Sequence, residues 1–188
     1  VIAIIGITYL LFTEKQANRE LVQEFQLDKE DLEKMAKICM ENGVMLISDE
    51  IHSDLIFHGK HHTPVASLSP EIAKYVITGI SGTKTFNLAG LIHSHVVIYD
   101  KKLMETYDAY IKTVGSAEVN IMGVTALEAA YCGGEEWFEN VKALICHNYD
   151  YMKQEFAREV PEIKITPLEG TYLSWLDLRG CMPGDQVA

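Results

Sequence analysis

The feature that most constrains the fold is a helical pattern that runs directly into a short apolar segment ending in acidic residues. From residue 28 to residue 42 apolar side chains recur at helical spacing, with Asp28 as the predicted N-cap and Gly43 as the predicted stop. Residues 44–47 follow as an uninterrupted apolar run, which is typical of a strand covered on both faces. A helix that feeds a buried strand predicts an α/β sheet.

Reactive side chains follow the predicted strands of this sheet. Ser48, Asp49 and Glu50 end the first strand, and ligands of α/β sheets lie beyond the carboxyl ends of the strands. A short helix at 69–74 and a strand at 75–78 lead into a connection rich in Gly, Ser and Thr, residues 79–87, which contains Lys84. Taken singly, an acidic strand end is more often a helix cap or a salt bridge, and a lysine in such a loop is usually solvated.

The second half of the chain is mainly helical. We predict a strand at 94–98 and helices at 101–114, 117–131 and 135–159, with a break at Gly133 and Gly134. The last helix is longer than is usual in globular proteins, so we expect that it bridges two domains or is interrupted. A strand at 171–176 would then belong to the start of a small α+β unit. The expected division is a partial large domain at 1–145, followed by the linking helix and small domain at 146–188.

Composition narrows the classes of partner. The formal net charge is −11 with no basic stripe, so we expect small molecules and no nucleic acid as partners. Residues 1–12 are apolar but shorter than the roughly 18 residues of a membrane span, and a buried strand is the simpler interpretation. The four cysteines form no CxxC pair, which favours reduced thiols in the cytoplasm. His58, His61 and His62 lie in a polar loop without zinc-site spacing, so we expect surface histidines.

The two strand-end motifs together carry a resemblance that neither carries alone. Asp49 opens the segment DEIHSD at 49–54, and Lys84 opens KTFNLAGL at 84–91. In this order the motifs resemble the centre of fold type I pyridoxal-phosphate enzymes of the aminotransferase superfamily, and they look most like MalY/PatB-type cystathionine β-lyases, also called C-S lyases. Further similarity runs through NIMG at 120–123, EAAY at 128–131 and EGTY at 169–172, so the likeness covers roughly residues 28 to 181.

The resemblance implies a three-layer α/β/α fold with a mostly parallel sheet and pyridoxal 5'-phosphate as cofactor. Asp49 would hold the protonated pyridine nitrogen, and Lys84 would form the Schiff base and later act as the base on the α-carbon of the substrate. His52 would contact the ring hydroxyl, where many relatives have a tyrosine. Ser81 and Thr83 would donate hydrogen bonds to the phosphate. Family members are generally homodimers, so a homodimer is expected.

Departures from the family pattern shape the functional hypotheses. Ile92 stands where many aminotransferases carry a phosphate-binding arginine, and the lyase-like subgroup often lacks that arginine too. Residues 1–27 lack the Asn-Pro motif that the family carries upstream of the predicted helix at 28–42. Arg179 is a candidate to bind the substrate carboxylate only by default, and a structural role is the simpler interpretation. We therefore expect about half of an enzyme. The leading hypothesis is a C-S β-lyase acting on cystathionine or cysteine-like amino acids. A class I/II aminotransferase and a catalytically incomplete fragment are the alternatives.

Overall fold

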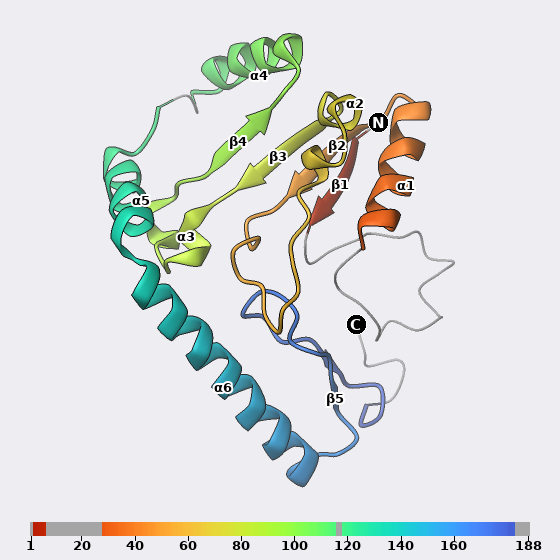
Figure 1. The fold of residues 1–188 in the computed structure, drawn as a ribbon, viewed down its shortest axis with the longest axis vertical. Coiled ribbons are helices and arrows are strands. Elements are labelled where there is room, and N and C mark those ends of the chain that lie inside the picture. The colour runs from red at the N-terminus through yellow and green to blue at the C-terminus, as the bar shows by residue number, and fades with distance from the viewer. Residues whose placement is uncertain (1, 7–27, 116–117, 183–188) are drawn as a thin grey trace.

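A four-stranded sheet organises the chain (Figure 1). The computed structural model describes residues 2–6, 28–115 and 118–182, with the backbone alone for residues 2–6. The strand order is β1 (Ile2–Gly6), β2 (Met45–Asp49), β3 (Val76–Ile80) and β4 (His95–Ile98). The first three strands are parallel and β4 is antiparallel to β3, which confirms a mostly parallel α/β sheet. Residues 7–12 of the opening apolar run lie outside the described residues.

Local capping sets the bounds of α1 (Lys29–Glu41) close to the predicted ones. The Asp28 carboxylate accepts a hydrogen bond from the backbone N–H of Asp31 at 2.9 Å, which satisfies a donor that the first helical turn leaves free. At the other end, the Asn42 side chain donates to the Ile38 carbonyl at 2.8 Å. Gly43 then adopts a φ of +64°, a conformation that glycine reaches without steric cost.

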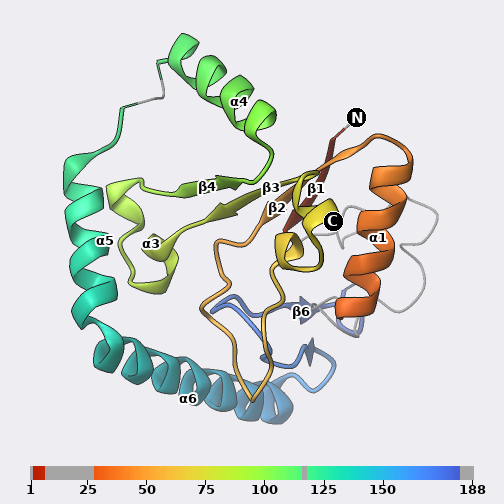
Figure 2. The ribbon, with the colours of Figure 1, turned by 45° about the horizontal axis from the view of Figure 1, so that its top comes forward.

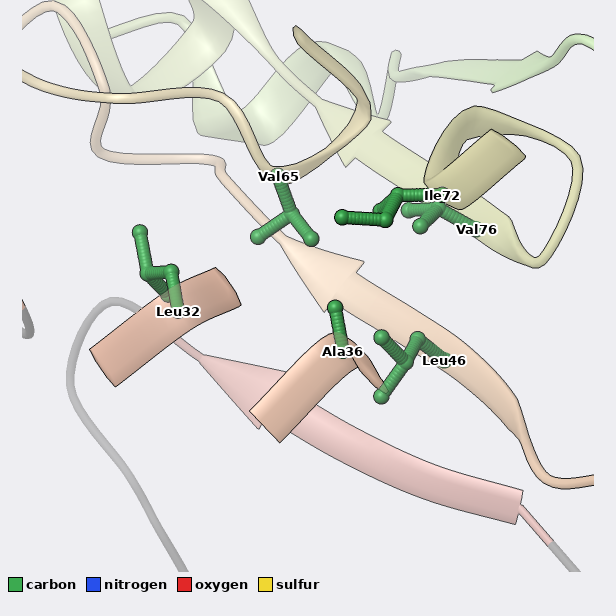
Figure 3. Packing of buried hydrophobic residues seen from close by; sticks show 6 residues of the cluster. All are labelled: Leu32, Ala36, Leu46, Val65, Ile72 and Val76. Carbon is green, nitrogen blue, oxygen red and sulfur yellow. The ribbon is translucent and has the colours of Figure 1, made fainter. Parts of the chain in front are cut away.

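The core between α1 and the sheet fixes β2 and β3 in place (Figure 3). Leu46 and Val76 are register partners on these strands and are both fully buried. They pack against α1 and against the short helices η1 (Val65–Ser67) and α2 (Pro70–Ala73); the other members of the cluster are Leu32, Ala36, Val65 and Ile72. Burial of each large side chain contributes roughly 1.5–3 kcal/mol. The strands that end in Asp49 and lead to Ser81 are thereby held in register.

The two faces of β2 differ in burial. Alternate side chains of a strand point to opposite faces, and Leu46 and Ser48 lie on the buried face. Met45 and Ile47 lie on the other face and are half-buried. The expectation of a strand covered on both faces is therefore met on one face among the described residues.

Helices dominate the rest of the chain, as the periodicity predicts. They are α3 (Gly82–Thr85), η2 (Ala89–Leu91), α4 (Lys101–Thr113), α5 (Ile121–Gly133) and α6 (Glu135–Glu159). The start of α5 is later than the predicted residue 117 because Asn120 is its N-cap and accepts from Met122 N–H at 3.1 Å. No helix in the described ranges has the length and apolar content needed to cross a bilayer.

The long helix α6 is continuous over its 25 residues. It contains no Gly or Pro that would interrupt it, and Gly134 separates it from α5. In Figure 2, α6 runs along the lower edge of the molecule and leads to the two-stranded antiparallel pair β5 (Lys164–Ile165) and β6 (Leu176–Asp177).

The predicted strand at 171–176 is wrong except at its last residue. Thr171 has a φ of +57°, which is incompatible with an extended strand, and β6 begins only at Leu176. Residues 169–171 instead dock on the segment that follows β2. A second buried cluster holds this contact together, and its members are Leu55, Phe57, Tyr149 and Leu168.

Candidate active site

Asp49 and Lys84 lie at or just after the ends of the neighbouring parallel strands β2 and β3. Asp49 is the last residue of β2, and its register partner on β3 is Gly79. Lys84 lies in α3, whose N-cap is Ser81, directly after the end of β3. Carboxyl ends of parallel strands meet at the same sheet edge, where ligands of α/β folds bind. Both side chains are half-buried.

The charges of Asp49 and Lys84 both act on the imidazole of His52. Its side chain is buried, with 6% of its surface exposed. Burial lowers the pKa of the imidazole below its ordinary 6.5, the nearby charge of Lys84 lowers it further, and the charge of Asp49 opposes the shift. Lys84 and Asp49 therefore lie close enough to act on the same ring. The structure brings these three predicted residues together, with His52 neutral at neutral pH.

Lys84 carries an amine without a carboxylate partner. Among the described residues, no Asp or Glu oxygen lies within 4.0 Å of its Nζ. Five other lysines of that part of the chain do pair with aspartate or glutamate, namely Lys34, Lys37, Lys60, Lys101 and Lys142. A half-buried amine that is not held in an ion pair is available to attack a carbonyl carbon.

The hydroxyls of Ser81 and Thr83 are bonded to each other in this structure. Ser81 Oγ donates to the His93 carbonyl at 2.7 Å and lies 2.6 Å from Thr83 Oγ1. Since a hydroxyl has one hydrogen, Thr83 is the donor of the second bond. Ser81 Oγ also accepts from the Thr83 backbone N–H at 3.3 Å. Both side chains are buried where α3 begins, and their role toward a phosphate stays a prediction.

Asp54 and Tyr131 also belong to the site, and sequence reasoning gave them no role. One carboxylate oxygen of Asp54 accepts from Thr85 Oγ1 at 2.7 Å and from the Tyr131 hydroxyl at 3.2 Å. Thr85 directly follows Lys84, so Asp54 ties the lysine turn to the segment after β2 and to α5. Both residues lie inside the family-like motifs at 49–54 and 128–131, so the resemblance is the sequence signal that points to them.

The ring of Tyr131 also explains the glycine in the lysine turn. A Cβ atom at Gly82 would lie 2.6 Å from Tyr131 Cε2 and 2.7 Å from its hydroxyl oxygen, so a larger residue displaces the ring. Burial, and then the charge of Asp54, raise the pKa of the Tyr131 phenol. Phe86, the C-cap of α3, packs edge-on against Tyr131 with the ring centroids 5.0 Å apart. Tyr131 therefore contacts the lysine turn through its ring and is joined to it by the hydrogen bonds of Asp54.

Glu50 is the most enclosed carboxylate near the site. It is 3% exposed, and its Oε1 accepts from Ser48 Oγ at 2.9 Å and from the Val65 backbone N–H at 3.1 Å. His62 Nε2 lies 2.8 Å from its Oε2. The expectation of a surface histidine is therefore wrong for His62, because it pairs with this buried carboxylate. The three bonds fold residues 51–65 back against the end of β2.

The remaining candidates are exposed or take part in other contacts. His58 and His61 are exposed, as predicted, and within the described ranges no three His, Cys, Asp or Glu side chains gather as a metal site. Ile92 is 87% exposed.

Arg179 forms a two-point contact with Asp177 at 2.7 and 2.8 Å, which lowers the pKa of that carboxyl to about 2. The guanidinium is thus engaged within its own turn.

Comparison with known proteins identifies the family. The model of the aminotransferase class I and II family matches residues 26–182. The chain belongs to this family. Cystathionine beta-lyase PatB of Bacillus subtilis is 39% identical over 149 residues, which is 79% of the chain and 38% of PatB. Protein MalY of Escherichia coli is 30% identical over 151 residues, which is 80% of the chain and 38% of MalY.

A solved structure shows the same likeness in three dimensions. Cystalysin from Treponema denticola, whose crystal contains a pyridoxal 5'-phosphate cofactor, superposes with a TM-score of 0.78 at 33% identity. The match covers 81% of the chain and 39% of cystalysin. The chain thus spans about two-fifths of the length of these relatives, and the fold type I resemblance is confirmed.

The side chains of this class I and II family member fit the cofactor of its relatives. A pyridinium nitrogen needs a carboxylate, and Asp49 has one oxygen that accepts a single bond, from Ile51 N–H at 3.3 Å. An aldehyde needs an available amine, and that of Lys84 forms no ion pair with any residue that the structure describes. A ring oxygen needs a hydrogen-bond donor, and the buried His52 has a ring N–H that can serve as one. The donor set therefore suits pyridoxal phosphate.

Proposed function

We propose that the protein is a pyridoxal-phosphate-dependent carbon–sulfur β-lyase that acts on cystathionine or cysteine-like amino acids. The observation that carries the proposal is that Asp49, His52 and Lys84 lie together at the ends of β2 and β3, and that Lys84 forms no ion pair with the described part of the chain. The likeness to cystathionine beta-lyase PatB over 79% of the chain supports the choice of reaction. The balanced reaction converts the amino acid and water into pyruvate, ammonia and a thiol.

Each residue has a distinct part in this proposal. The cofactor, when bound, supplies an electron sink for the negative charge that develops at the substrate α-carbon. The Asp49 carboxylate accepts a hydrogen bond from the pyridine N–H and stabilises its positive charge. His52 donates a hydrogen bond to the ring oxygen. The Lys84 amine first holds the cofactor and then takes the proton from the α-carbon, after which the thiolate leaves Cβ.

Trapping at Lys84 tests the binding half of the proposal. The protein is incubated with pyridoxal phosphate, reduced with borohydride and digested, and the peptide that gains the cofactor mass is identified by mass spectrometry. We expect the label on Lys84, no label in Lys84→Ala, and an undiminished label in the control Lys102→Ala, which alters an exposed lysine on α4. A label spread over surface lysines at equal yield contradicts the assignment.

Product analysis tests the reaction half. We expect equal amounts of pyruvate and free thiol from cystathionine, without any added keto acid, and loss of both in Lys84→Ala. Turnover that requires a keto acid and releases no thiol identifies an aminotransferase instead. A label on Lys84 without either turnover identifies a catalytically incomplete fragment.

Four further expectations stay predictions. They are the homodimer, the cytoplasmic location, the domain division at 145 and 146, and the phosphate contacts of Ser81 and Thr83. For the homodimer, sedimentation equilibrium of the protein with and without pyridoxal phosphate is the direct test. Support comes from α5, which is apolar around its circumference yet has only Gly123 and Leu127 buried among its described residues.

A further inference from the structure

His52 is held by a residue from the far end of the chain. Its Nδ1 lies 3.2 Å from Thr171 Oγ1, and both side chains are 6% exposed. The Tyr172 ring meets the imidazole edge-on, with centroids 5.2 Å apart and an interplanar angle of 78°. With Nδ1 engaged, Nε2 is the ring nitrogen left for a ligand.

Thr171 occupies this place at a conformational cost. Its φ of +57° lies in the left-handed region, where β-branched residues are genuine outliers. Such a backbone costs roughly 1–3 kcal/mol and persists only where surrounding structure holds it. Glycine would remove the strain but would lack the hydroxyl. The presence of a strained threonine at this position therefore favours a use for its hydroxyl.

The surrounding backbone holds Thr171 rigidly against the segment that carries His52. Thr171 N–H donates to the Leu55 carbonyl at 2.7 Å, and Phe57 N–H donates to the Glu169 carbonyl at 3.0 Å. Between these bonds Ile56 and Gly170 form an antiparallel bridge. The two segments form a short ladder, so the distance from Thr171 to His52 is set by the backbone and not by a mobile side chain.

We propose that Thr171 is a positioning residue that donates its hydroxyl proton to His52 Nδ1, so that the imidazole keeps its proton on Nε2 and presents that N–H to the cofactor. The proposal rests on the proposed function of His52 as a ligand of the cofactor. An imidazole nitrogen is a good acceptor for an alcohol, and the tautomer of a histidine is set by the hydrogen bond that its other nitrogen makes. Tyr172 fixes the plane of the ring.

Nitrogen-15 NMR of His52 in the cofactor-free protein is the primary test. Four variants are compared with the parent: Thr171→Val removes the hydroxyl and keeps the shape, Thr171→Ser keeps the hydroxyl, Thr171→Gly removes both hydroxyl and strain, and Thr166→Val removes a buried hydroxyl of the same segment that bonds the Trp175 carbonyl. We expect a single Nε2-protonated tautomer in the parent. The Nδ1 resonance should shift in Thr171→Val and Thr171→Gly, and return in Thr171→Ser.

The Gly variant keeps the test decisive if Thr171→Val fails to fold, since glycine adopts the native φ without strain. Unchanged His52 nitrogen shifts in Thr171→Val or Thr171→Gly overturn the proposal, as does an equal shift in Thr166→Val. A second readout is cofactor affinity, which we expect to fall about 2- to 10-fold in Thr171→Val, the equivalent of one hydrogen bond, and to recover in Thr171→Ser.

The two proposals fail in different ways. If the parent gives no label at Lys84 but the His52 resonances respond to Thr171 as expected, the proposed function fails and the positioning contact stands. If the label forms and the His52 resonances ignore Thr171, the positioning role alone fails.

Discussion

Replacement of Glu50 should reveal how strongly its buried carboxylate holds the segment after β2. In Glu50→Ala, the Val65 N–H and the Ser48 hydroxyl lose their acceptor, and His62 loses its partner. A buried donor left unsatisfied costs about 1–3 kcal/mol. Because the Ser48 hydroxyl can rotate toward other acceptors, we expect a total loss of about 3 kcal/mol in the free energy of unfolding.

Glu50→Gln separates the hydrogen bonds from the charge. Its amide oxygen can still accept from Ser48 and Val65, and its amide nitrogen can donate to a neutral His62. We therefore expect a loss of only about 1 kcal/mol. Glu41→Ala is the matched control, because this glutamate is exposed at the end of α1, and surface changes of this kind stay within about 0.5 kcal/mol.

Urea denaturation followed by circular dichroism measures these losses, provided that the slope of the transition stays the same in every variant. A cycle with His62→Ala and the double variant isolates the Glu50–His62 pair, for which we expect a coupling of about 1 kcal/mol. A loss below 1 kcal/mol in Glu50→Ala, or equal losses in Glu50→Ala and Glu50→Gln, would refute the reasoning.

Three other predictions follow from single contacts. Leu46→Ala opens a cavity in the fully buried core and should cost about 2–5 kcal/mol in urea denaturation; a cost under 1 kcal/mol would mean that the core collapses around the gap. Gly82→Ala should push the Tyr131 ring away and lower the pKa of its phenol, because the ring leaves the buried place beside Asp54; an unchanged ultraviolet titration would contradict this. The pKa of folded His52 lies below its unfolded value near 6.5, so the unfolded chain binds the proton first as the pH falls. The free energy of unfolding should then decrease below pH 6.5, by at most about 1.4 kcal/mol per pH unit from this group, and His52→Gln should flatten that slope in urea melts at several pH values.

The sequence predicts most of what depends on local signals. The bounds of α1 follow from the Asp28 cap and Gly43. Helix α6 starts after the predicted break at Gly133 and Gly134, and it continues to the predicted Glu159 because no Gly or Pro interrupts it. Asp49 and Lys84 could be placed at one sheet edge because strand ends are readable from apolar runs that stop at polar residues.

Contacts between distant segments were not predictable in the same way. The Glu50–His62 pair and the Asp54–Tyr131 bond join residues 12 and 77 positions apart, and neither pairing leaves a periodic pattern. The sequence predicts a strand at 171–176 because β-branched and aromatic residues such as Thr171, Tyr172 and Trp175 favour extended backbone. The docking of residues 169–171 on the segment after β2 overrides that local preference.

The contact between His52 and Thr171 also has a consequence for how the chain folds. The two residues are 119 positions apart, so the entropy of closing that loop must be overcome before their bond can form. Contacts of such separation slow folding, and the sheet with the Lys84 turn can form earlier from nearer parts of the chain. During synthesis from the N-terminus, His52 leaves the ribosome long before its partner. The imidazole at the centre of the site is therefore among the last groups to reach its final orientation.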